Sequence, residues 1–234
     1  MKTFRAVPFI LLSVGVLLYS CKKDDDDPDN GGDKITEALA GGNFDVWEQI
    51  TVGAVSFDNP AGDWWASLNM LSVIGGPATV GKTADAYAGP YAARLETKKW
   101  GDDLTIPGIL ASGYFDKNLP MGENLVIGKP FDRRPVSFNG FYKYTPAGAD
   151  SLVILTALTK YRTDANRCDT IAQAVLVSGE SLSQYAPFSI DLNYASHETP
   201  DSIHVILLSS IKGKEMQGYE GSVLFVDELS LTYD

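Results

Sequence analysis

Short apolar runs that alternate with polar residues are the feature that most constrains this fold. In Phe188-Ser189-Ile190-Asp191-Leu192-Asn193 the apolar side chains lie two residues apart, which is the period of a half-buried strand. No long stretch shows the 3.6-residue period of an amphipathic helix. Strand-like runs occur instead at residues 44–50, 67–74, 91–97, 108–115, 136–144, 151–161, 171–177, 188–194, 202–209 and 222–233.

Turn-forming residues separate these runs. Asn59-Pro60, Gly89-Pro90 and Lys212-Gly213-Lys214 are typical of hairpin-length connections, and no helical pattern lies between the runs. Short connections without crossover helices favour antiparallel pairing. The sequence therefore predicts an all-β antiparallel sandwich, in particular a jelly roll, as a single domain over residues 35–234.

The N-terminus has the form of a bacterial lipoprotein signal. Lys2 and Arg5 precede an uncharged stretch over residues 6–18, which is too short to cross a bilayer as a stable helix. Leu18-Tyr19-Ser20-Cys21 resembles a lipobox. We expect residues 1–20 to be a removed signal peptide and Cys21 to carry the lipid; an ordinary secretory signal or a short membrane anchor is the alternative.

Residues 21–34 predict a disordered tether, because their charges, Gly and Pro cannot bury apolar surface. Lys22-Lys23 followed by Asp24–Asp27 resembles the signal that sends lipoproteins of Bacteroidetes-type bacteria to the outer face of the outer membrane; a solvated spacer is the alternative. The aspartates do not fit a calcium loop of the EF-hand type, whose Gly and final Glu are missing in register.

The charge of the chain limits its partners. After removal of residues 1–20, 17 basic residues face 30 acidic ones, a net charge of −13. This composition argues against nucleic acid and anionic lipid head groups, so we expect membrane contact through the lipid alone. With Cys21 lipidated, Cys168 has no partner for an internal disulfide, and we interpret it as a bystander.

Residues 76–83, GPATVGKT, match the phosphate-binding pattern GxxxxGK[ST]. That chemistry needs a helix after the loop, so that its N-terminal N–H groups face the phosphates. Here Gly89-Pro90 follows Thr83 too closely for a helix. We therefore expect a glycine-rich turn and no nucleotide.

Known catalytic patterns are not apparent. Only His197 and His204 could act as histidine bases, and no GxSxG motif accompanies them. Two histidines and one free cysteine also give no zinc spacing. Glycoside cleavage needs only two carboxylates, which the acidic residues could supply, so it stays open although the sequence favours a protein without catalysis.

Sugar binding needs aromatic faces beside polar groups. Trp64, Trp65 and Trp100 lie in polar, glycine-containing loops and are candidate ligand-binding residues. Because neighbouring side chains of an extended segment point in opposite directions, we expect at least one of Trp64 and Trp65 to be exposed. The alternative is that these rings cap the core.

Asp45 and Asp227 are candidate metal ligands. They lie in the first and last strand-like runs, which come together in a jelly roll and could share a structural Ca²⁺ with backbone carbonyls. The alternative is that both are merely solvated.

Six segments together resemble one family: residues 42–47 (GNFDVW), 65–69 (WASLN), 89–97 (GPYAARLET), 128–135 (GKPFDRRP), 138–144 (FNGFYKY) and 221–229 (GSVLFVDEL). They are similar to the carbohydrate metabolism domain (PCMD) lipoproteins of gut Bacteroidetes, over essentially the whole mature chain. The resemblance implies a galactose-binding-like jelly roll and a cell-surface role in glycan use. Arg133 and Arg134, in the most specific segment, become candidate partners of a sugar. Likeness to calcium-bearing carbohydrate modules also places Asp45 and Asp227 at metal-ligand positions, although Glu is more usual at the first.

The leading functional hypothesis is therefore a surface lipoprotein with a non-catalytic glycan-binding domain. A structural or adhesion module that contacts another protein is the second hypothesis, because exposed strand edges and aromatic loops serve that role equally well. A glycoside hydrolase is the third.

Overall fold

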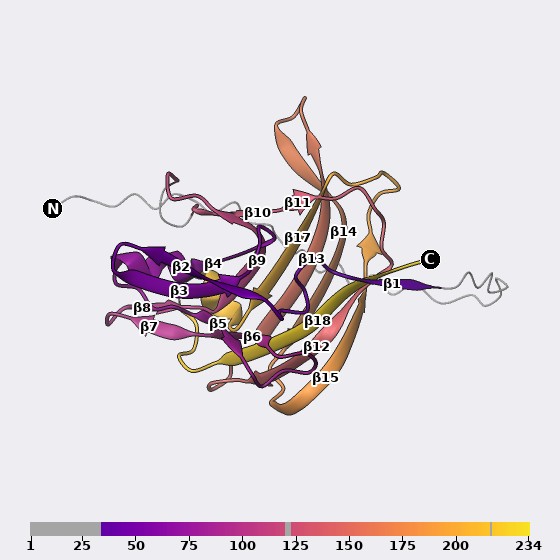
Figure 1. The fold of residues 1–234 in the computed structure, drawn as a ribbon. Coiled ribbons are helices and arrows are strands. Elements are labelled where there is room, and N and C mark those ends of the chain that lie inside the picture. Colours follow the sequence, from indigo (N-terminus) through magenta and orange to yellow (C-terminus); the bar gives the residue numbers. More distant parts are fainter. Residues whose placement is uncertain (1–33, 120–122, 216) are drawn as a thin grey trace.

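The computed structural model describes residues 34–119, 123–215 and 217–234, and strands make up most of its regular structure. Two antiparallel sheets lie face to face, with hairpins extending beyond them (Figure 1). The predicted all-β sandwich is confirmed. The predicted signal peptide, Cys21 and the tether before Lys34 lie outside the described residues. Within the described ranges, no helix is long and apolar enough to cross a membrane.

The first sheet contains both ends of the described chain. Its strands pair in the order β15-β12-β18-β6-β5, and β1 also pairs with β18. The six strands are β1 (Ile35–Ala38), β5 (Val80–Thr83), β6 (Ala92–Glu96), β12 (Ser137–Thr145), β15 (Leu182–Asp191) and β18 (Val223–Tyr233).

Strand β18 changes its neighbour midway. Its residues 223–226 pair with β6, and its residues 230–233 pair with β1. The register with β12 shifts between these two halves, and Glu228 has a φ of 51°. A non-glycine residue with positive φ is uncommon and strained. This irregular segment creates a junction at Asp227–Leu229 where neither β6 nor β1 continues the ladder.

The second sheet has the order β10-β9-β17-β13-β14-β16, with β11 beside β17 and β4 beside β9. Its strands are β4 (Trp65–Ser67), β9 (Ile109–Phe115), β10 (Leu125–Ile127), β11 (Lys129–Pro130), β13 (Leu152–Arg162), β14 (Arg167–Ser178), β16 (Asn193–Tyr194) and β17 (Ser202–Leu208).

One hydrophobic core lies between the two sheets. Ile203, Val205 and Leu207 alternate along β17 and are fully buried, and Phe138 and Tyr144 face them from β12. Burial of one such side chain contributes about 1.5–3 kcal/mol to the free energy of unfolding. The apolar residues that recur at every second position in the sequence are therefore those on the faces where the two sheets pack together.

Two hairpins stand outside the sandwich, on the side of Figure 1 opposite β1 and the C-terminus. One is formed by β2 (Trp47–Val52) and β3 (Val55–Pro60), and the other by β7 (Lys98–Trp100) and β8 (Leu104–Ile106). The expected strand at 44–50 is therefore only the first arm of a hairpin, whose second arm the alternation did not reveal.

The expected strand at residues 67–74 is wrong. Residues Leu68–Ile74 form a 3-10 helix, η1, and a second one, η2, spans Ile211–Glu215. The hydroxyl of Ser67 caps η1 by accepting from the Asn69 N–H, and Gly75 ends it in the left-handed conformation. The apolar residues of this segment fit the period of a strand as well as that of a helix. The Ser67 cap and the terminating Gly75 therefore determine that it is helical.

The phosphate-loop motif lies on a turn and a strand. Residues 75–79 lead from η1 into β5, and Lys82 lies within β5, where its ammonium nitrogen is 3.5 Å from an Asp58 carboxylate oxygen. Thr83 ends β5, and turns lead from there to β6. This part of the chain is described throughout, and it places no helix N-terminus at the glycine-rich turn.

Candidate functional site

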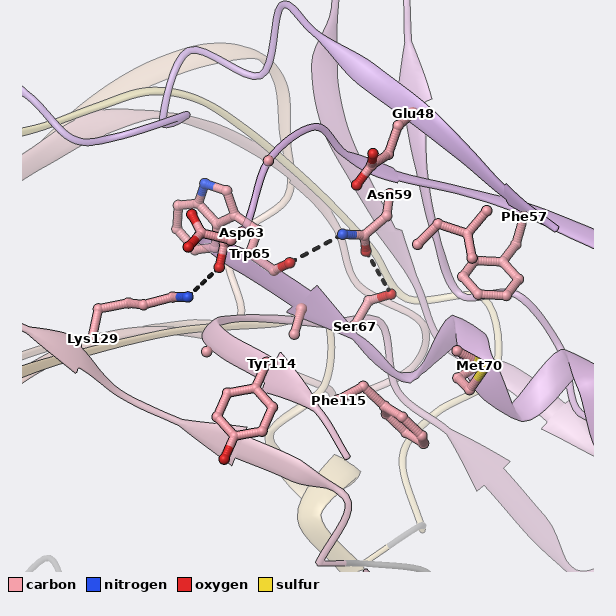
Figure 2. Close-up of a pocket in the computed structure, with 14 residues that line it drawn as sticks. Glu48, Phe57, Asn59, Asp63, Trp65, Ser67, Met70, Tyr114, Phe115 and Lys129 are labelled. Atoms are coloured by element: carbon pink, nitrogen blue, oxygen red, sulfur yellow. Dashed lines mark hydrogen bonds between the residues drawn. The ribbon is translucent and has the colours of Figure 1, made fainter. Parts of the chain in front are cut away.

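A pocket of about 450 Å³ opens between the β2–β3 hairpin, β4 and the end of β9 (Figure 2). Its aromatic lining comes from Tyr114, which is 54% exposed, together with Phe115 and the buried Phe57. Glu48 and Asp63, both exposed, add carboxylates to the same lining. The pocket thus combines an open aromatic ring with hydrogen-bonding groups, as small-molecule sites do.

Asn59 shapes the wall of this pocket. Its buried Nδ2 donates to the Trp65 carbonyl at 3.0 Å, and its Oδ1 accepts from the Ser67 hydroxyl at 3.1 Å (Figure 2). Lys129 closes another side by donating to the carbonyl of Asp63. These bonds join β3 to β4, and β11 to the loop before β4, so the hairpin is held against the second sheet by polar contacts.

Asn69 fixes η1, which supplies Met70 to the pocket. The Asn69 side chain is fully buried and makes four hydrogen bonds to backbone groups. Its Nδ2 donates to the carbonyls of Asp58 (2.9 Å) and Val80 (2.7 Å), and its Oδ1 accepts from the N–H groups of Thr79 (2.8 Å) and Val80 (3.0 Å). One amide thereby ties η1 to both β3 and β5.

The three predicted tryptophans do not line one exposed groove. Trp65 is 3% exposed, and its indole N–H donates to the Gly41 carbonyl at 3.0 Å. The ring packs against Phe44, so it cannot stack on a ligand although the residue borders the pocket. Trp64 is half-buried against the core, and Trp100 is half-buried on the β7–β8 hairpin. Neither Trp64 nor Trp65 is exposed, so the expectation that at least one of them would be is wrong, and Trp65 is a core residue.

The two predicted arginines lie away from the pocket and already have protein partners. Arg133 stacks 3.8 Å from the centre of the Tyr233 ring and pairs with Glu37, whose pKa it lowers. Arg134 donates to the Ser196 carbonyl at 3.1 Å and stacks over the Tyr194 ring. Arg133 thereby links β1 to the end of β18, and Arg134 contacts β16 and the loop that follows it.

The structure brings Asp45 and Asp227 to the same loop, residues 84–90. Fully buried Asp227 occupies the junction in β18, where its Oδ2 accepts from the N–H groups of Tyr87 (2.8 Å) and Ala88 (3.1 Å). Asp45 lies against the adjacent Gly89, where a Cβ would meet its Oδ1 at 2.0 Å. Residues far apart in sequence are thus joined through neighbouring positions of one loop.

The electrostatics of this acid pair are unusual. Burial raises the pKa of Asp227 to about 6 even though three backbone N–H groups lower it. The Oδ1 of Asp45 is buried and has no hydrogen-bond partner among the described residues. Phe44, beside Asp45, has a φ of 50°, and Glu228, beside Asp227, has one of 51°. Strained backbone and an unsatisfied buried oxygen are features that a bound cation would explain.

The acid pair fits Ca²⁺ only if the backbone supplies the remaining ligands. No group of three or more His, Cys, Asp or Glu side chains suited to a metal occurs in the part of the chain that the structure describes. Ca²⁺ takes six to eight oxygen ligands and accepts backbone carbonyls, whereas a zinc site would need more side chains.

Sequence reasoning missed the exposed ring of Tyr114 and the carboxylates of Glu48 and Asp63. The sequence could have indicated Asp63, because it directly precedes Trp64 and Trp65 in the loop predicted to bind a ligand. Tyr114 follows four buried residues of β9, Leu110–Gly113, so its exposure follows from the loss of cover at the end of the strand. Cys168 is exposed on β14, and His204 donates to or accepts from the Thr159 hydroxyl at 2.9 Å.

No protein-family model matches the sequence, and no curated protein matches it. Two crystal structures share the fold, both of proteins described as provisional glycoside hydrolases. The one from Bacteroides vulgatus is 19% identical, with a TM-score of 0.67 over 81% of this chain and 96% of that one. The one from Bacteroides thetaiotaomicron is 18% identical, with a TM-score of 0.65 over 85% and 69%. At such identities the likeness bears on the fold alone: the chain is an antiparallel β-sandwich of the type seen in these Bacteroides proteins.

A family 16 carbohydrate-binding module is 13% identical, with a TM-score of 0.36 over 65% of this chain and 84% of that one. A likeness this low carries no argument about function.

Replacing Asn69 tests whether polar contacts hold the pocket together. Asn69→Ala removes the side-chain partner of four backbone groups, three of them in buried hydrogen bonds, so the free energy of unfolding should fall by about 2–4 kcal/mol in denaturant titrations. The amides of Thr79 and Val80 should also lose protection from hydrogen exchange. Asn118→Ala is the control, because that exposed side chain donates to Asp116, two residues away. An equal loss in both variants would contradict the assigned role.

Proposed function

We propose that this chain is a glycan-binding protein and that the pocket between the β2–β3 hairpin and β9 is its sugar site. The observation that carries the proposal is the exposed Tyr114 ring in a cavity that also holds the carboxylates of Glu48 and Asp63. A sugar ring stacks its C–H face on an aromatic side chain, and its hydroxyls donate to carboxylates. This chemistry replaces the groove of tryptophans expected from the sequence.

Two further observations support a role in glycan use. The sequence segments resemble PCMD lipoproteins, and the two Bacteroides proteins with the same fold are described as provisional glycoside hydrolases. Membership of the PCMD family is part of the proposal.

Hydrolysis is the second candidate, because Glu48 and Asp63 line the same pocket and a glycosidase needs two carboxylates on either side of the scissile bond. Binding is favoured because neither carboxylate is enclosed. Both residues are exposed, whereas a general acid that must stay protonated needs burial or a like-charged neighbour to raise its pKa.

We further propose that the chain is a lipoprotein held at the outer face of the outer membrane by Cys21. The tether would enter the sandwich at β1, and β1 lies on the opposite side of the molecule from the β2–β3 hairpin (Figure 1). A domain anchored in this way can turn its pocket away from the membrane and toward soluble glycans.

We propose Ca²⁺ as a structural ion at Asp45 and Asp227. Its charge would favour the ionised form of the buried Asp227 carboxylate, and it would give the unsatisfied Asp45 oxygen a partner. The ion would fasten the 84–90 loop to the junction in β18, a stabilising role separate from the sugar pocket.

Glycan binding is tested by affinity gel electrophoresis of residues 34–234 in a panel of plant, microbial and host polysaccharides. At least one polysaccharide should retard the protein, and Tyr114→Ala should weaken its affinity by about tenfold, because the stacking face is lost. Tyr161→Ala is the matched control: that tyrosine is 47% exposed and lies on β13.

Three outcomes would contradict non-catalytic glycan binding at this pocket. Retardation that survives Tyr114→Ala would place the glycan elsewhere, and release of shorter sugars from the retained polysaccharide would favour hydrolysis. No retardation by any polysaccharide, with a stoichiometric surface protein recovered instead, would favour the adhesion role.

The anchor is tested with the full chain in a Bacteroidetes host. Cys21→Ser should move the protein from the membrane fraction to the soluble fraction, because it removes the acylated thiol. Cys168→Ser, which changes the exposed cysteine of β14, should leave the protein in the membrane. Retention of the Cys21→Ser protein in membranes would disprove lipid attachment at this residue.

Calcium is tested by thermal unfolding of the protein in 1 mM CaCl₂ and, separately, in excess chelator. This CaCl₂ concentration is about a thousandfold above a Kd of about 1 μM. At such a ratio Ca²⁺ should stabilise the native protein by about 4 kcal/mol. Asp227→Asn and Asp45→Asn should each abolish the shift in Tm, whereas Asp102→Asn, on the β7–β8 turn, should retain it. An equal Tm in Ca²⁺ and in chelator for the unaltered protein would rule the ion out.

A further inference from the structure

A second, smaller pocket of about 250 Å³ adjoins the sugar pocket. Met70 and Phe115 line both of them, so the two pockets are neighbours that share these two residues. Met70 is supplied by η1 and Phe115 by the end of β9, the two elements that the buried Asn69 and the second sheet hold in place.

The two pockets differ in chemistry. The larger one carries the carboxylates of Glu48 and Asp63, whereas the smaller one is lined mainly by aliphatic side chains. Those aliphatic residues are Val52, Leu71, Val73 and Ile74. Of the described residues around the smaller pocket, the polar ones are Lys117 and Asn124, and the Asn124 amide already donates to the Leu119 carbonyl at 2.7 Å.

Part of this aliphatic lining lies open to solvent. Ile74 is 58% exposed and Val52 is 37% exposed, while Leu71 forms a buried floor. A ligand that covered these side chains would remove apolar surface from water, which is favourable in proportion to the area buried. A further sugar would instead bring hydroxyl groups against aliphatic walls, where losing water without a new partner costs free energy.

From this arrangement we propose that the paired pockets bind an alkyl glycoside: the sugar occupies the larger pocket, and an aliphatic chain attached to it occupies the smaller one. This inference rests on the proposed function and names the ligand class of the same site. The shared wall of Met70 and Phe115 selects such an amphiphile, because the unbranched Met70 side chain adapts to a flexible chain. A second protein copy is not favoured, since a cavity of this size covers far less than the roughly 800 Å² per partner of a stable interface.

The test compares methyl, butyl and hexyl glycosides of glucose, galactose, mannose and xylose with residues 34–234, by NMR titration below the micelle concentration. For at least one sugar the Kd should tighten about three- to fourfold for each methylene that enters the pocket. The methyl glycoside should shift the Tyr114 signals alone, and the hexyl glycoside should also shift those of Ile74 and Val73.

Two matched variants assign the effect to the smaller pocket. Ile74→Glu puts a charge into the aliphatic lining and should remove the gain of the hexyl over the methyl glycoside, while leaving methyl-glycoside binding unchanged. Ile35→Glu, on β1, is the control, because this isoleucine has the same 58% exposure but lies outside both pockets. It should keep the full gain.

Other results would overturn the inference. It fails if chain length does not alter the Kd, if Ile74→Glu keeps the gain, or if 1-hexanol binds as tightly as hexyl glycoside, since the sugar would then contribute nothing. If any of these results is found but the unaltered protein is still retarded by a polysaccharide in affinity gels, the proposed function stands and only the alkyl-chain site is disproved. If no polysaccharide retards the unaltered protein either, both the proposed function and this inference are disproved.

Discussion

Burial of the facing apolar sides of two sheets is the constraint on which this structure depends. Every second residue of β17 and β12 points into one core. Residues such as Val205 and Phe138 therefore fix which face of each strand turns inward. Both candidate sites lie at the margins of this core, where loops and a hairpin meet the strands that build it.

Polar contacts do at these margins what apolar burial does in the core. Asn69 binds four backbone groups and ties η1 to β3 and β5, and Asn59 ties β3 to β4. These bonds are strong in place because the groups are buried, where an unpaired amide costs about 1–3 kcal/mol. A cavity held by such contacts keeps its shape while its rim, with Tyr114 and Ile74, stays open.

The acid pair shows how an irregular strand creates a site. Because β18 passes from β6 to β1, its ladder is interrupted at Asp227, and the loops that leave both neighbours meet there. Asp45 and Asp227 had been paired from the sequence on the expectation that terminal strands meet. Asp45 instead precedes β2 of the outer hairpin, so the two acids are linked by their contacts with Gly89 and Ala88 of one loop and not by pairing of terminal strands.

The sequence by itself determined the sandwich, because a two-residue period leaves a strand one face to bury and the frequent turns allow only antiparallel neighbours. It could not determine which loop side chains stay exposed, since exposure depends on what covers them. Trp65 went into the core, Arg133 and Arg134 found partners near β1, and η1 replaced an expected strand through its capping residues. Only the tertiary structure left Tyr114 uncovered at the end of β9 and placed two carboxylates in the lining of the same pocket. Packing between distant segments decides such a surface, and no local pattern encodes it.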